Sequence, residues 1–340
     1  AMGIGIGMGI PAPIVAGAVV TGASFGDKLS PLSDSTNLAA ATAQAGLFDH
    51  VRHMLKTTVP SFLLALVVYG IISTTLDANA GNPEVIEKLT SVIDANFKIS
   101  PLIFIPPVII ILMIGLKVPP VPGMLVGVIA GIAMCFYQGA DVGTILTTLY
   151  SGPTIETKNE MVDKLLARGG LLFMMETISL VICALSFGGA IKAIGAVDTI
   201  IETILKHVRR RGSIIATNVV MSIFCNFAAA DQYMSIVIPG QMYKKVYKQL
   251  NMAPENLSRT LEDAGTLTSG LVPWSTCGAV YLATLNVSAF AYGRYHLIGI
   301  INPIIAIVYA YAGIFLNPLD KSKPIKTRLT DEDIVEMDKA

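Results

Sequence analysis

The chain has 340 residues, of which 53% are hydrophobic and only 14% are charged, and its mean hydropathy is +0.64. Since a soluble domain has about a quarter charged residues, this composition excludes an ordinary soluble fold and predicts an all-α, polytopic membrane protein. The 24 lysine and arginine residues balance the 24 aspartate and glutamate residues, and zero net charge argues against a nucleic-acid partner.

Two apolar stretches near the start of the chain, residues 14–25 and 35–45, are predicted to be half-helices on either side of a polar segment. Gly26 and Pro31 are expected to break the helix between them, because proline has no amide hydrogen and glycine is conformationally free. Hydroxyl and carboxylate side chains just before the second stretch would cap a new helix that begins near Ser35. The alternative is an external loop with ordinary turn residues.

The remaining apolar stretches are predicted to be membrane spans, because about 20 apolar residues cross ~30 Å of hydrocarbon. They are residues 59–76, 101–116, 123–137, 171–194 and 297–316, with an interrupted apolar region at 260–291 and an interfacial helix at 156–167. Lysine and arginine gather in the connectors 46–57, 206–211 and 244–248 and at the start of the tail. These connectors are therefore expected in the cytoplasm of a bacterial cell, and the acidic loops 77–100 and 139–168 outside the inner membrane.

The apolar segment 213–240 lies between two basic connectors that both belong on the cytoplasmic side. It must enter and leave on one side, which predicts a re-entrant hairpin with its tip near residues 225–230. The hairpin contains Asn226 and Asp231. Asp231 is the favoured titrating carboxylate, because burial favours its protonated form and a bound cation favours its ionised form.

Two parts of the chain resemble each other at a separation of about 240 residues. LSPLSDST at 29–36 is similar to TSGLVPWST at 268–276, and the span that follows each copy is expected to cross in the opposite direction. This predicts an inverted repeat, as in many secondary transporters. The predicted organisation is 1–76 as the end of a first repeat truncated at its N-terminus, 77–100 as an external loop, 101–317 as the second repeat and 318–340 as a cytoplasmic tail.

The interrupted helices predict an ion-binding site. A helix that ends inside the membrane leaves free carbonyl groups that favour a cation, and one that begins there leaves free amide groups that favour an anion. Oxygen ligands suit a hard cation such as Na⁺. The predicted ligands are Asp27, Ser30, Asp34, Ser35, Thr36 and Asn37 in the first copy, Asn226 and Asp231 in the hairpin, and Asp263, Thr266, Ser269 and Thr276 in the second copy.

Three further charged residues have competing interpretations. Lys28 is expected to pair with Asp27 or Asp34, or to extend toward water. Glu262 is interpreted as an interfacial cap, and Glu176 as either an interfacial residue or a ligand. The four cysteines have no zinc or redox spacing and are interpreted as packed thiols.

Four long segments resemble the NhaC family of bacterial Na⁺/H⁺ antiporters, which is part of the wider ion-transporter superfamily. They are residues 7–41 (GMGIPAPIVAGAVVTGASFGDKLSPLSDSTNLAAA), 169–191, 228–243 and 257–279. The resemblance implies paired hairpins, broken helices and exchange of Na⁺ for H⁺, with Na⁺- and H⁺-coupled exchange of a small carboxylate such as malate or lactate as the alternative. Family members have an additional N-terminal half.

Other classes of function are less well supported. SFGDK departs from the G-x-G-D motif of membrane aspartyl proteases at Ser24, and the chain has no H-E-x-x-H zinc motif, so an enzyme is not predicted. An inactive or structural membrane fragment stays open as an alternative. Na⁺, H⁺ and the lipid bilayer are the expected partners, no cofactor is expected beyond the transported ions, and a homodimer is left open.

Overall fold

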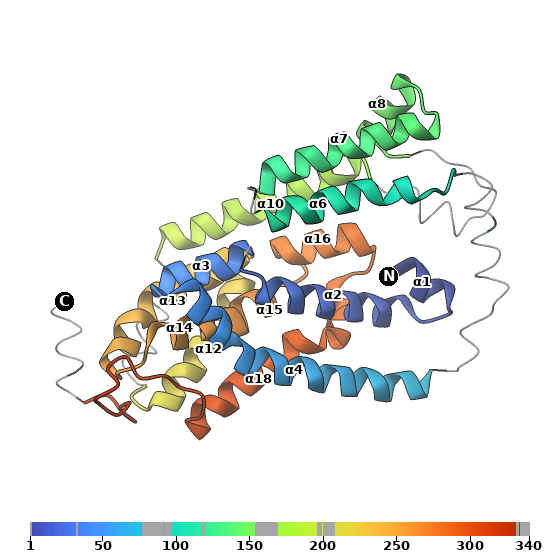
Figure 1. Cartoon of the computed structure of the whole chain (residues 1–340). Coiled ribbons are helices and arrows are strands. Elements are labelled where there is room, and N and C mark those ends of the chain that lie inside the picture. Colours follow the sequence, from blue (N-terminus) through green and yellow to red (C-terminus); the bar gives the residue numbers. More distant parts are fainter. Residues whose placement is uncertain are drawn as a thin grey trace. The chain divides into compact units, whose positions relative to one another are not determined.

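The computed structural model describes residues 2–31, 33–76, 97–116, 118, 120–153, 169–195 and 208–330, and the single positions 91, 199 and 333. Within these residues the regular structure is helical, with only two isolated β-bridges, which confirms the predicted all-α class. The chain forms two units: residues 1–2, 11–77 and 179–340 make the larger one, and residues 3–10 and 78–178 the smaller one (Figure 1).

The first interrupted helix is present. Helix α2 (Ala12–Leu29) stops before Ser30, and α3 (Asp34–Ala43) follows after a gap of four residues that contains Pro31. The prediction that Gly26 breaks the helix was wrong, because α2 continues through it. A glycine inside a helix costs only about 1 kcal/mol relative to alanine, which neighbouring helical residues offset.

The span after the first interruption is longer than predicted. Helix α4 (Leu47–Thr75) has 29 residues and begins at the connector that was expected to be a cytoplasmic loop. Among the described residues, α4 and α12 (Arg211–Ala229) are each long and apolar enough to cross a membrane. A bent pair, Ala289–Tyr295 with Leu297–Ala312, would make a third span.

The second interrupted helix begins with α14 (Pro254–Leu261), η3 (Glu262–Thr266) and α15 (Leu267–Ser269), which follow one another without a break. Gly265 lies in η3, a single π-helical turn, and does not interrupt the helix. The interruption comes at residues 270–275, before α16 (Thr276–Leu285). The chain continues through α17 (Ala289–Tyr292), η4 (Gly293–Tyr295) and α18 (Leu297–Ala312).

The two interrupted helices share their order of parts and run in opposite directions. Each has a proline in its first turn, an interruption, and then a helix of 10 residues. The 10-residue helices α3 and α16 both end at a left-handed residue, Gln44 and Asn286. Figure 1 shows α2 and α3 running one way through the larger unit and α14 to α16 the other way. An inverted repeat has interrupted helices of opposite direction, and the repeat as a whole stays a prediction.

The predicted hairpin consists of α12 and α13 (Gln232–Gln249), which pack against each other. Its tip is at Ala230, which has a left-handed conformation with φ of 55°, and at Asp231. Both arms extend beyond the predicted segment. Since α12 is long enough to cross a membrane, the re-entrant course of this hairpin stays a prediction.

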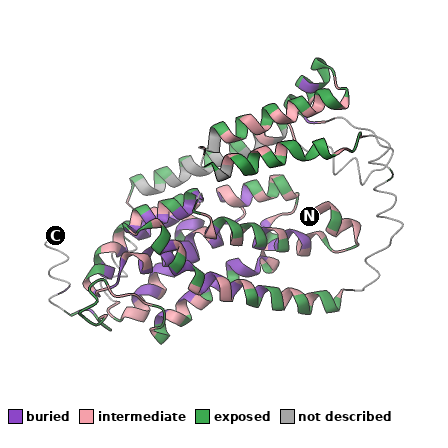
Figure 2. Cartoon of the chain, in the orientation of Figure 1, coloured by how far each residue is buried: buried purple, intermediate pink, exposed green. Residues whose placement is uncertain are grey.

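The main hydrophobic core lies where α3, α12, α13 and α14 meet (Figure 2). The described part of the predicted tail packs against this end of the larger unit. The amide of Leu319 donates to the carbonyl of Asn251 over 3.0 Å, and the amide of Arg211 donates to the carbonyl of Thr327 over 2.9 Å. The start of the tail is therefore hydrogen-bonded to the connectors of α12 and α14.

The smaller unit contains η2 (Pro101–Phe104), α6 (Ile105–Gly115), α7 (Pro120–Gln138) and α8 (Val142–Ser151), and α6 packs on α7. The short helix α1 (Met2–Gly7) lies mostly in this unit, and α10 (Leu171–Ala193) has residues in both units. Most of the external loop 77–100, the interfacial helix 156–167 and the Glu176 side chain lie outside what the structure describes.

Replacement of Gly17 in α2 by alanine is expected to destabilise the protein by about 1–3 kcal/mol, because overpacking forces neighbours apart. An added Cβ would lie 2.3 Å from Cβ and 2.7 Å from the carbonyl carbon of Tyr295. Gly22→Ala is the matched control, since nothing lies within 4 Å of the Cβ position there. The measurement is thermal unfolding in detergent, and equal melting temperatures for the two variants would contradict this packing.

Candidate ion-binding site

The centre of the larger unit contains a buried ion pair between the two interrupted helices. Lys28 in the last turn of α2 contacts Asp263 in η3, and both side chains have no exposed surface. The prediction that Lys28 pairs with Asp27 or Asp34 was wrong. Since successive helical residues point about 100° apart, the uninterrupted α2 leaves Asp27 exposed and directs Lys28 toward η3.

Asp263 also accepts two neutral hydrogen bonds through the same oxygen, Oδ1. Thr57 Oγ1 in α4 donates over 2.9 Å, and Asn302 Nδ2 in α18 donates over 2.8 Å. Ser61 in α4 holds the amide of Asn302 by donating to its Oδ1 over 2.8 Å. The spans that follow the two interruptions therefore both supply donors to this carboxylate.

Sequence reasoning missed Thr57, Ser61 and Asn302, although the sequence contains a signal for each. Asn302 is a lone amide inside an otherwise apolar span. Thr57 and Ser61 are four residues apart, which places them on one face of a helix. All three side chains are fully buried, so they had to find partners inside the protein.

A second cation lies close to this carboxylate. Arg259 in α14 is only 2% exposed, and its Nε is 3.9 Å from Oδ2 of Asp263. Its Nη1 donates to the carbonyl of Phe315 over 2.8 Å, which ties the guanidinium to the chain after α18. Asp263 thus has Lys28 on one side and Arg259 on the other, and its negative charge is compensated.

Glu262 has a different environment from its neighbour. We interpreted it from the sequence as an interfacial cap, and this was wrong, because its side chain has no exposed surface. Neither of its carboxylate oxygens has a hydrogen-bond partner among the described residues. The π-helical turn places both Glu262 and Asp263 inside the protein, and such turns are often found at functional sites.

The amide of Asn226 in α12 stabilises this turn. Its Nδ2 donates to the carbonyl of Gly265 over 2.7 Å and to Oγ1 of Thr268 over 2.9 Å. A π turn displaces a carbonyl from the regular helical ladder, and the amide provides a donor for it. The Oδ1 of Asn226 is buried and has no hydrogen-bond partner among the described residues.

Asp231 joins the tip of the hairpin to the second interruption. It is 2% exposed and caps α13, accepting from the amide of Met234 over 3.3 Å. Its Oδ1 accepts from Oγ1 of Thr276, the first residue of α16, over 3.3 Å. The amide of Thr276 donates to the carbonyl of Ala230 over 3.0 Å. Two predicted ligands from different segments therefore lie together.

The first-copy ligands divide between a buried and an exposed face. Ser35 and Thr36 are fully buried, and Oγ1 of Thr36 donates to the carbonyl of Lys28 over 3.1 Å, which spans the interruption. Asp34 is exposed and accepts from the hydroxyl of Tyr233 in α13. Asn37, also exposed, donates to the carbonyl of Ser33 over 2.7 Å.

The 12 predicted ligands thus do not form one coordination shell. Asp263, Asn226 and the Asp231–Thr276 pair lie around the second interrupted helix, where the buried hydroxyl oxygens of Thr266 and Ser269 have no hydrogen-bond partner in the part of the chain that the structure describes. Asp27, Asp34 and Asn37 are exposed in this chain, and Ser30 is half-buried at the first interruption. Among the predicted ligands, this buried group stays the candidate for an internal ion site.

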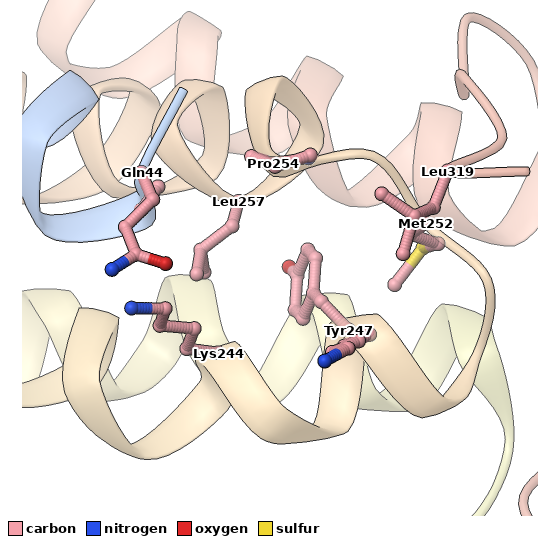
Figure 3. A pocket seen from close by; sticks show the side chains of 9 residues that line it. Gln44, Lys244, Tyr247, Met252, Pro254, Leu257 and Leu319 are labelled. Atoms are coloured by element: carbon pink, nitrogen blue, oxygen red, sulfur yellow. The ribbon is translucent and has the colours of Figure 1, made fainter.

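The structure also has a surface pocket of about 210 Å³ that is separate from these carboxylates. Figure 3 shows Gln44 and Lys244 at one end of it and Met252 and Leu319 at the other. It contains none of the predicted ligands. The candidate site is therefore the buried polar centre rather than this cavity.

The profile of the Na⁺/H⁺ antiporter family matches residues 22–314, which include the first interruption, the hairpin and the second interrupted helix. The chain belongs to this family. It is 41% identical to the Na⁺/H⁺ antiporter NhaC of Alkalihalophilus pseudofirmus over 321 residues, which are 92% of this chain and 68% of that protein. No solved structure matches the chain.

Other members of the family are also similar. The Na⁺/H⁺ antiporter NhaC of Bacillus subtilis is 34% identical, covering 91% of this chain and 69% of that protein. The malate-2H⁺/Na⁺-lactate antiporter of B. subtilis is 33% identical, covering 92% of this chain and 67% of that protein. The chain spans about two thirds of the length of these family members, and the predicted resemblance to NhaC-type antiporters is confirmed.

Proposed function

We propose that the chain is a secondary active transporter that exchanges Na⁺ for H⁺ across the bacterial inner membrane by alternating access. The observation that carries the proposal is the buried polar centre between two interrupted helices of opposite direction, with Asp263, Glu262 and Asp231 inside it. Family membership supports the choice of ions. We assign no catalysis and no cofactor beyond the transported ions.

The geometry suits exchange of small cations. The last turns of α2 and α15 bring the carbonyl ends of two helices to the interruptions, and α3 and α16 begin there with their amide ends, as α13 does at the tip of the hairpin. Cations are favoured at the former, and ionised carboxylates such as Asp231 are stabilised at the latter. Because the two interrupted helices run in opposite directions, a tilt of one of them and its neighbours against the other would expose the centre to one side at a time.

The decisive experiment is reconstitution of the chain in proteoliposomes with an internal acid load and a fluorescent pH dye. We expect external Na⁺ to drive H⁺ efflux with saturation, and K⁺ or choline to have no effect. A flux that needs malate or lactate together with Na⁺ would favour the organic-acid alternative, in line with the B. subtilis relative. Absence of any Na⁺-dependent flux would favour the inactive or structural alternative.

Asp231→Asn is expected to slow Na⁺-driven H⁺ flux by at least about 10-fold, because it removes the charge from a carboxylate that is almost fully buried. Asparagine can still cap α13, so folding should be retained. Asn286→Asp, at an exposed turn after α16, also changes the net charge of the chain by one and is the control for that change. A wild-type flux in Asp231→Asn would remove Asp231 from the set of ligands.

A further inference from the structure

The residues proposed above for the ion site do not account for the charge of the buried Glu262 side chain. It is fully buried, and neither carboxylate oxygen has a hydrogen-bond partner in the described part of the chain. An ionised carboxylate in that position is strongly disfavoured unless something compensates its charge. The carboxylate must therefore hold a proton or a cation.

Two hydroxyl groups are placed to help bind a cation. Thr266 lies at the far end of the same π turn and Ser35 lies in the first turn of α3, and both hydroxyl groups lie near the Glu262 carboxylate without forming a hydrogen bond of normal geometry to it. Oγ1 of Thr266 is itself buried and has no hydrogen-bond partner among the described residues. Carboxylate and hydroxyl oxygens are the hard ligands that a cation such as Na⁺ requires.

The charges on the packed helices leave Glu262 as the uncompensated carboxylate. Lys28 forms its ion pair with Asp263, and Arg259 lies on the Oδ2 side of Asp263. Asp231 accepts from the amide of Met234 in α13 and from the hydroxyl of Thr276 in α16. Ionisable side chains on the surrounding elements include Asp27 and Lys28 of α2, Asp34 of α3, His50 and His53 of α4, Asp231 before α13, Tyr247 of α13, Arg259 of α14 and Asp263 of η3.

We propose that Glu262 is the carboxylate that alternately holds Na⁺ and H⁺, with the hydroxyl oxygens of Thr266 and Ser35 as neutral ligands. When Na⁺ binds, the O–H bond of the protonated carboxyl group breaks, the proton leaves to water on the open side, and the carboxylate oxygen coordinates Na⁺. On the other side the reverse step restores the carboxyl group. This inference rests on the proposed Na⁺/H⁺ exchange and assigns it to a residue.

The test compares Glu262→Gln with Glu255→Gln in the reconstituted full chain. Glu255 lies in the same helix, and its carboxylate accepts from Asn317 over 2.8 Å, a bond that the amide oxygen of glutamine can also accept. We expect Glu262→Gln to lower Na⁺-driven H⁺ flux by at least about 100-fold and to abolish the rise in melting temperature that Na⁺ produces, because a buried charge is lost. Glu255→Gln should keep both.

A third variant, Thr266→Val, tests the proposal independently if Glu262→Gln does not fold. Thr266→Val keeps the volume and removes one neutral ligand, and we expect it to raise the Na⁺ concentration for half-maximal flux by about 10-fold. If Glu262→Gln transports within threefold of wild type, or Thr266→Val has an unchanged Na⁺ dependence, the assignment is overturned while the exchange function stands. If the wild-type chain transports no Na⁺, the proposed function itself fails.

Discussion

Replacement of Asp263 by asparagine is expected to destabilise the protein by about 3–5 kcal/mol, because removal of one partner of a buried ion pair leaves the other charge uncompensated. Lys28 has no exposed surface, so its ammonium group cannot turn to water. Arg259 is 3.9 Å from the same carboxylate and would also lose its counter-charge. Two buried cations would then lie beside each other.

Lys28→Met is expected to cost less than Asp263→Asn. The carboxylate of Asp263 would keep the hydrogen bonds from Thr57 and Asn302 as well as the nearby guanidinium of Arg259. The double variant Lys28→Met with Asp263→Asn restores charge balance within the pair. It should therefore be more stable than the sum of the two single changes predicts, which a double-mutant cycle measures directly.

The control is the exposed pair of Lys323 and Asp320, whose charged atoms are 3.7 Å apart and whose side chains are 75% and 47% exposed. Lys323→Met should change stability by no more than about 0.5 kcal/mol, since water and salt screen such pairs. The measurement is reversible unfolding in mixed micelles. Additive effects of Lys28→Met and Asp263→Asn would show that the two side chains are not coupled.

Much of the architecture follows from local sequence signals. Pro31 and the serine-rich stretch after it produce the first interruption, and Pro273 lies in the second. These signals are strong because proline removes a donor and blocks the preceding helical turn, whatever the tertiary context. Glycine is weaker evidence, and Gly26 and Gly265 both lie inside helical turns.

The ion pair between Lys28 and Asp263 could not be predicted from the sequence, because its partners lie on distant segments. Lys28 and Asp263 are 235 residues apart, and only the packing of α2 against the second interrupted helix brings them together. Local proximity favoured Asp27 and Asp34 as partners, yet both are exposed in the structure. In a membrane protein the partner of a buried charge is set by helix packing, which a pattern along one segment does not encode.

The burial of Glu262 depends on one turn of unusual geometry. In a regular α-helix, adjacent residues point about 100° apart, so two acidic neighbours would not both face the interior. The π turn at Glu262–Thr266 widens the helix at this point, and both carboxylates are buried. No residue type by itself specifies a π turn; it forms where tertiary partners such as Asn226 supply the missing donor.

Gly278→Ala is expected to destabilise the protein by about 3 kcal/mol, at the upper end of overpacking effects. The second interruption folds back over the first turn of α16, and Oγ of Ser275 accepts from the amide of Gly278 over 2.9 Å. A Cβ at Gly278 would lie 2.1 Å from the carbonyl oxygen of Val272, a backbone atom that no side-chain rotation can move.

The alanine must push the interruption away from α16, which would separate Thr276 from Asp231 and lower Na⁺-driven H⁺ flux by at least about 10-fold, as small displacements at a binding site can. Gly70→Ala in α4, where nothing lies within 4 Å of the Cβ position, is the matched control and should behave as wild type. Thermal unfolding and proteoliposome flux measure the two effects. If both variants unfold and transport alike, the interruption is not held against α16, and the junction of Asp231 with Thr276 does not depend on that contact.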